Sequence, residues 1–146
     1  MEYLAKLFSK NKLSSLTLLA GGSLALLTGC AEEIVQDVMP TVDSNVTTDD
    51  LADGTYTATG SYVSPGGRES VEVTVSLEEG IVADINVTSL AKNPNSKEYQ
   101  AKFISGIVNQ VVGKSILSLN VSKVAGSSLT SGGFNQAIVK IINEAS

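Results

Sequence analysis

The sequence predicts a small α+β domain, in which an antiparallel sheet carries helices packed on one face. Three segments with apolar residues at every second position come first, and a short Glu-Glu-Gly turn separates the last two. Two segments with apolar residues three and four positions apart follow, with a short apolar stretch between them. The expected order is therefore β-β-β-α-β-α, over residues 53–146.

The expected strands cover residues 55–63, 71–77 and 81–88. In the first, Tyr56 and every second residue after it should face the core, and in the second every odd residue from Val71 to Leu77. In the third strand, the residues expected to face the core are Ile81, Ala83, Ile85 and Val87. Glu78-Glu79-Gly80 predicts a hairpin turn, and Pro65-Gly66 predicts a tight bend before the second strand.

The first helix should begin at Asn95, with Glu98 completing a capping box, and end at Gly113. Its apolar stripe contains Tyr99, Phe103, Ile104, Ile107, Val108, Val111 and Val112. Residues 116–121 read as a short strand. The last helix should follow with Thr130 or Ser131 as its N-cap, and its stripe contains Phe134, Ala137, Ile138, Ile141, Ile142 and Ala145.

The first 29 residues have the pattern of a secretory signal, with three lysines ahead of an apolar stretch. Leu27-Thr28-Gly29-Cys30 resembles the lipobox of bacterial lipoproteins. The resemblance implies that Cys30 is lipidated and holds an exported protein on the outer side of the cytoplasmic membrane or the cell surface. A retained transmembrane anchor is the alternative, but the apolar stretch is short and is interrupted by Gly21, Gly22 and Ser23.

Residues 30–52 read as a flexible tether, because they show neither a strand nor a helix period and carry several aspartates. Cys30 is the single cysteine, so no disulfide can form within the chain, and the absence of histidine excludes histidine-based acid–base catalysis. Cleavage before Cys30 leaves seven basic and fourteen acidic residues, a net charge of −7. Without a basic patch, nucleic acid is not an expected partner.

Small and hydroxylated residues lead into the last helix. A helix N-terminus offers unpaired N–H groups and a positive dipole end, which suit a phosphate. Gly126, Gly132 and Gly133 would let a ligand approach the backbone, and four hydroxyls could bind phosphate oxygens: Ser127, Ser128, Thr130 and Ser131. The alternative is an elaborate helix cap without a ligand.

The segment Ala125-Gly126-Ser127-Ser128-Leu129-Thr130-Ser131 resembles the C-terminal signature of the FMN-binding domain family, Ser-Gly-Ala-Thr-x-Thr-Ser. Asp53-Gly54-Thr55-Tyr56 also matches the family's opening. The resemblance covers nearly all of residues 53–146. It implies an exported domain that binds FMN and takes part in bacterial electron transfer.

In covalent members of that family, the phosphate of FMN is joined to the position that Ser128 occupies, and Thr130 and Ser131 match the residues that follow it. The family's flavin transferase reads an aspartate where this chain has Ser122, and Ala125 and Ser127 also depart from the signature. Covalent attachment at Ser128 and non-covalent binding therefore both stay open. Arg68, in the bend before the second strand, could reach a phosphate or the flavin edge, or belong to the turn alone.

The expected function is a membrane-tethered flavin carrier that passes electrons to a redox partner outside the cytoplasmic membrane, loaded by a flavin transferase if the bond is covalent. A stand-alone enzyme is not expected. The alternative is a non-catalytic surface-binding or structural module that keeps the fold without flavin. One of five aromatic residues should cover the flavin ring, and the others should pack in the core: Tyr56, Tyr62, Tyr99, Phe103 and Phe134.

Replacing Cys30 with alanine should release the protein from the membrane or leave its signal uncleaved, because lipidation requires the thiol. Fractionation of cells and gel migration of the Cys30→Ala variant check this. A variant that fractionates and migrates like the wild type contradicts the lipoprotein assignment.

Overall fold

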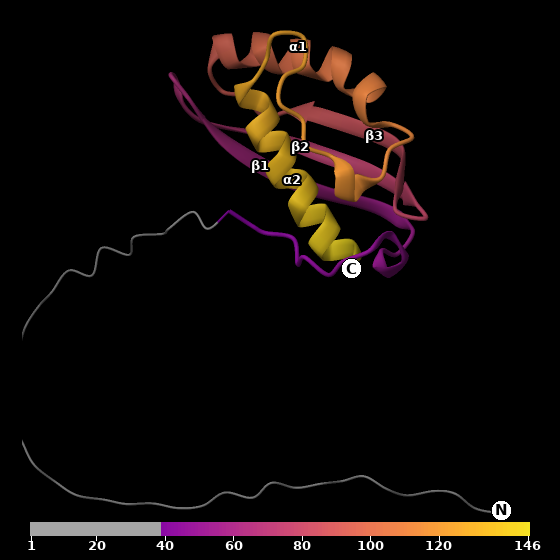
Figure 1. Cartoon of the computed structure of the whole chain (residues 1–146). Coiled ribbons are helices and arrows are strands. Elements are labelled where there is room, and N and C mark those ends of the chain that lie inside the picture. The colour runs from indigo at the N-terminus through magenta and orange to yellow at the C-terminus, as the bar shows by residue number, and fades with distance from the viewer. Residues whose placement is uncertain (1–38) are drawn as a thin grey trace, which may run out of the picture. The chain divides into compact units, whose positions relative to one another are not determined.

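The computed structural model describes residues 39–146, so the predicted signal and Cys30 lie outside the described residues. Strands β1 (Gly54–Ser64), β2 (Gly67–Glu78) and β3 (Ile81–Ser89) come first, followed by helices α1 (Pro94–Val111) and α2 (Leu129–Ala145). Figure 1 shows both helices on the same side of the sheet. The α+β prediction is confirmed. Neither α1 nor α2 is long and apolar enough to cross a membrane.

The sheet is antiparallel, with the strand order β1-β2-β3. On β2 the odd-numbered residues from Glu69 to Leu77 are buried under the helices, as the alternation predicts. The opposite, open face carries pairs of hydroxyl groups that bond across β1 and β2: Thr55 with Ser76, Thr57 with Thr74, and Ser61 with Ser70. These pairs make the open face of β1 and β2 polar.

The third strand departs from the predicted alternation at its start. Ser76 pairs with Asp84 but Leu77 pairs with Val82, so β3 has one extra residue at this point. Such a bulge shifts the side chains before it to the other face of the sheet. Val82 is buried, whereas Ile81 and Ala83 are exposed, contrary to the expectation for these two residues.

Helix α1 starts earlier than predicted, because Asn93 is its N-cap and accepts a hydrogen bond from the Asn95 amide. Pro94 fits the first position of the helix, where an N–H group would have no partner. The predicted capping box of Asn95 and Glu98 is therefore wrong, and Glu98 instead pairs with Lys102 at 2.7 Å. Gly113 follows the end of the helix with a φ of 80°, as expected.

The predicted strand over residues 116–121 is a 3₁₀ helix, Ile116–Ser118. Just before it, the chain bonds to the edge of β3, from the Gly113 amide to the Val82 carbonyl and from the Val82 amide to the Lys114 carbonyl. Ile116 then turns inward and is completely buried. The apolar residues of this stretch fill the core instead of extending the sheet.

Helix α2 lies against β1 with almost no space between the two backbones. A Cβ atom at Gly60 would overlap the carbonyl oxygen of Gly133, and one at Gly133 would lie 2.9 Å from the Tyr62 ring. Gly133 therefore serves helix–strand packing, not the approach of a ligand as the sequence suggested. Gln136 and Lys140 add hydrogen bonds to the outer edge of β1, at the Ser61 amide and the Thr59 carbonyl.

The packed unit begins before the predicted boundary at Asp53. Leu51 is only 6% exposed and belongs to the hydrophobic core, while Val42 and Val46 pack against that core in part. The Ala52 amide bonds to the Ala145 carbonyl at 2.8 Å, and Thr48 packs against Gly80 of the β2–β3 turn. The end of the expected tether is thus part of the folded domain.

Replacing Gly60 with alanine should destabilise the domain by about 1–3 kcal/mol or more, because the new methyl group must push α2 away from β1. Gly132→Ala is the control, since its methyl group would meet only the Tyr62 Cβ at an ordinary 4.0 Å. Chemical denaturation of both variants checks this. Equal stabilities would show that the close contact does not hold the helix in place.

Candidate functional site

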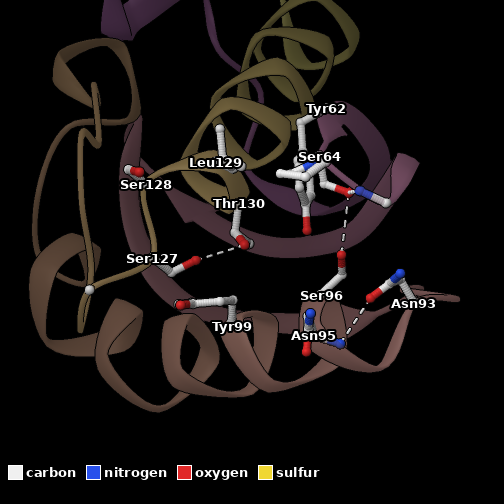
Figure 2. A pocket seen from close by; sticks show the side chains of 13 residues that line it. Tyr62, Ser64, Asn93, Asn95, Ser96, Tyr99, Ser127, Ser128, Leu129 and Thr130 are labelled. Carbon is white, nitrogen blue, oxygen red and sulfur yellow. Dashed lines mark hydrogen bonds between the residues drawn. The ribbon is translucent and has the colours of Figure 1, made fainter.

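A pocket of about 580 Å³ opens where the β1–β2 turn, the start of α1 and the start of α2 meet. Its size is that of a usual small-molecule site. Figure 2 shows side chains from all three segments around it. The lining residues are Tyr62, Ser64, Pro65 and Gly66 from β1 and its turn, Asn93, Asn95, Ser96 and Tyr99 from α1 and its cap, and Gly126, Ser127, Ser128, Leu129 and Thr130 from the loop and α2.

A tight turn over residues 124–127 delivers the loop to the pocket. Val124 and Ser127 exchange both of their backbone hydrogen bonds, at 3.1 and 2.8 Å. Between them Ala125 and Gly126 have φ values of 47° and 88°, the combination of a type I′ turn. Val124 packs closely on Gly106 of α1, where a Cβ would come within 2.8 Å. The turn is therefore anchored to α1, and it fixes where α2 begins.

The N-cap of α2 is Ser128, not Thr130 or Ser131 as predicted, and its side chain makes no capping hydrogen bond. Ser128 is exposed and lines the edge of the pocket. The Ser127 hydroxyl, buried at the pocket wall, donates to the Thr130 hydroxyl at 2.8 Å. The first turn of α2 therefore faces the pocket with no side-chain cap on its backbone N–H groups, an arrangement that suits an anion.

The structure brings together four of the six predicted site residues: Gly126, Ser127, Ser128 and Thr130. Ser131 points elsewhere, because it is buried and its hydroxyl donates to the Ser127 carbonyl at 3.2 Å. Arg68 is exposed beside the β1–β2 turn, paired in register with Val63, and does not line the pocket. The role expected for Ser131 as a ligand hydroxyl therefore does not fit this arrangement.

Sequence reasoning missed the side of the pocket that α1 forms. Asn93, Asn95 and Ser96 line this side, and the Ser96 hydroxyl donates to the Ser64 hydroxyl at 3.5 Å, which joins the start of α1 to the end of β1. Because α1 also begins here, the N-terminal ends of both helices border one pocket. Misplacing the start of α1 by two residues concealed this convergence.

Glu69 of β2 holds the chain just before α1 in place. Its carboxylate accepts hydrogen bonds from the backbone amides of Lys92 and Asn93, at 2.8 and 3.0 Å, while the side chain is 3% exposed. The bonds from Lys92 and then Asn93 lower the pKa of Glu69 below its ordinary value. The sequence contained an indication of this role, because Glu69 is a charged residue at a position where the alternation of β2 predicts a side chain facing the core.

Gln100 joins α1 to all three strands. It is fully buried, and its amide nitrogen donates to the Tyr62 hydroxyl at 3.0 Å and to the Ser70 carbonyl at 2.9 Å. Its amide oxygen accepts from the Ser89 hydroxyl at 2.6 Å. A buried amide with every group paired fixes the position of the helix that carries it.

A second hollow, of about 650 Å³, lies at the other end of the sheet and is lined by Asp53, Glu78, Glu79, Ile81, Val82, Ala83, Val112 and Gly113. Its three carboxylates make it a poor site for a phosphate. Within residues 39–146, no group of acidic or other ligating side chains is arranged to hold a metal ion. The pocket between the helix starts is thus the better candidate for an anionic ligand.

Comparisons of the chain with protein-family models, with curated proteins and with solved structures found no match. The resemblance to the FMN-binding domain family therefore stays a prediction from the sequence.

Replacing Glu69 with glutamine should lower the melting temperature at neutral pH. The carboxylate accepts the two backbone N–H groups with two oxygens, whereas a glutamine side chain has only one acceptor oxygen. Since folding lowers the pKa of Glu69, its contribution is present above the ordinary value of 4.5 and is lost as pH falls through the folded value. The difference from the wild type should therefore shrink below pH 4.5. Thermal melts across pH measure it, with Glu72→Gln on the open face as control. A difference that is independent of pH contradicts the assignment.

Proposed function

We propose that this chain is an extracytoplasmic flavoprotein that binds FMN in the pocket between the two helix starts and carries electrons, tethered to the membrane through Cys30. The observation that supports it is the first turn of α2, which opens into the pocket without a side-chain cap and presents Ser128 and Thr130 there. Ser128 is the position to which the resembling family's signature joins the phosphate of FMN, and Thr130 matches a residue that follows it in that signature.

The electrostatics of the pocket favour a phosphate bound by backbone groups. Among the described residues, none that lines the pocket is acidic or basic. A phosphate there would be stabilised by backbone N–H groups, by the dipole of α2, and by the hydroxyls of Ser128 and Thr130. The start of α1 borders the same pocket, but Asn93 caps it and the Glu69 carboxylate binds the two amides before it, so the free N–H groups in this proposal are those of α2.

In this proposal the protein supplies binding and orientation, and the isoalloxazine ring carries the electrons between a reductant and a redox partner protein. Ser128 is the position for a phosphoester bond if a flavin transferase loads the chain, because its hydroxyl is exposed and makes no capping bond. Thr130 is less accessible, being 1% exposed.

Titration of the purified protein with FMN and with riboflavin tests the proposal. Riboflavin lacks the phosphate, so it should bind about 10- to 100-fold more weakly than FMN. Ser128→Ala should weaken FMN binding and leave riboflavin binding unchanged, whereas Ser122→Ala, a loop serine outside the pocket, should change neither. Equal affinities for FMN and riboflavin would place the phosphate elsewhere. A protein that binds neither would be the flavin-free module.

Co-expression with a flavin transferase, followed by denaturation and in-gel flavin fluorescence, tests the covalent form. The wild type should keep its fluorescence and Ser128→Ala should lose it, while both remain folded because the hydroxyl is at the surface. An adduct that persists in Ser128→Ala moves the attachment site to another hydroxyl.

A further inference from the structure

The aromatic residues of the domain fall into two groups according to whether their rings are already covered. Phe103 and Phe134 are fully buried and pack against each other with ring centroids 5.4 Å apart. Tyr56 packs partly against the core, and its hydroxyl donates to the Ala52 carbonyl at 2.9 Å. Of the aromatic residues in the part of the chain that the structure describes, only Tyr62 and Tyr99 line the pocket.

Tyr62 and Tyr99 differ in how much of the ring is free. The Tyr62 ring lies against α2, close enough that a Cβ at Gly133 would come within 2.9 Å of it, and its hydroxyl accepts a hydrogen bond from Gln100. Tyr99 also lines the pocket, and it is 50% exposed. The Tyr62 ring is thus a fixed part of the pocket wall, whereas the exposed part of the Tyr99 ring is available for contact with a ligand.

Tyr99 is held in a defined place despite its exposure. The next residue, Gln100, is fixed by three hydrogen bonds to the sheet, so the backbone of α1 cannot shift here. Lys102 Nζ lies over the Tyr99 ring at 5.2 Å from its centroid, and Glu98 holds that ammonium group at 2.7 Å. Lys102 does not line the pocket, so its ammonium group contacts the Tyr99 ring from outside the pocket and leaves the pocket side of the ring open.

We infer that Tyr99 is the residue on which the isoalloxazine ring of the ligand stacks, an inference that rests on the proposed function. A phosphate at the start of α2 leaves the ring system to extend through the pocket toward α1, and Figure 2 shows Tyr99 on that side, across from Thr130 and Ser127. A flat ring system gains most from a flat aromatic surface that is fixed before it binds. Tyr99 offers such a surface.

Four tyrosine variants test this, with FMN and riboflavin as the probes: Tyr99→Phe, Tyr99→Leu, Tyr62→Phe and the control Tyr56→Phe. A stacked tyrosine quenches flavin emission and a stacked phenylalanine does not, so Tyr99→Phe should keep the affinity but restore the emission. Tyr99→Leu should weaken FMN and riboflavin by the same factor, about 3- to 10-fold, because both ligands carry the ring. Tyr56→Phe, outside the pocket, should change neither affinity nor emission.

Several results would overturn the inference. Emission that recovers in Tyr62→Phe, and not in Tyr99→Phe, would make Tyr62 the stacking residue. If both Tyr99 variants keep the affinity and the emission of the wild type, Tyr99 does not contact the flavin. FMN binding by the wild type would in that case still support the proposed function. A wild type that binds neither flavin overturns both. If Tyr99→Leu fails to fold, Tyr99→Phe still decides between these results.

Discussion

The close contact between Gly60 of β1 and Gly133 of α2 sets the geometry on which the rest of the domain depends. With no side chain between them, the helix lies directly on the strand, and its first turn comes level with the end of β1. The residues that follow Gly60 along β1 lead into the β1–β2 turn, and those that precede Gly133 along α2 form the other wall of the pocket. A wider spacing would separate these two walls.

Polar side chains that are buried, or half-buried in the case of Asn135, then fix the elements around that contact. Gln100 ties α1 to the sheet, Glu69 holds the chain just before α1, and Asn135 binds both backbone groups of Val121, at 3.0 and 2.9 Å. In the described part of the chain, no buried side-chain nitrogen or oxygen lacks a hydrogen-bond partner. Apolar packing alone tolerates small shifts of one element on another, whereas these directional bonds do not.

The fold was largely predictable because most of it follows periods that the sequence displays. The alternation of β2, the turn at Glu79 and Gly80, and the apolar stripe of α2 depend on neighbours close in the chain. The bulge in β3 and the burial of Leu51 depend on distant residues, such as the segment that bonds to Val82 and the end of α2. No pattern among neighbouring residues in the sequence indicates this bulge or this burial.

The candidate site divides in the same way. Its α2 side is one continuous motif, so the positions of Gly126, Ser127, Ser128 and Thr130 could be predicted together. Its α1 side is assembled from the β1–β2 turn and the start of α1, which only tertiary packing brings together. Arg68 was expected at the site only because its side chain could bind a phosphate and it lies near the β1–β2 turn. The register of the two strands pairs it with Val63 instead, and it lies outside the pocket.

The bonds from Gln136 and Lys140 to the outer edge of β1 also limit how copies of this domain can associate. An edge strand with unpaired backbone groups invites another strand to join the sheet. On β1 the Ser61 amide and the Thr59 carbonyl are already occupied by α2, and at the start of β3 the Val82 backbone is bonded to residues 113 and 114. The bulge beside Val82 further distorts the β3 edge. The domain thereby discourages growth of its sheet into an aggregate.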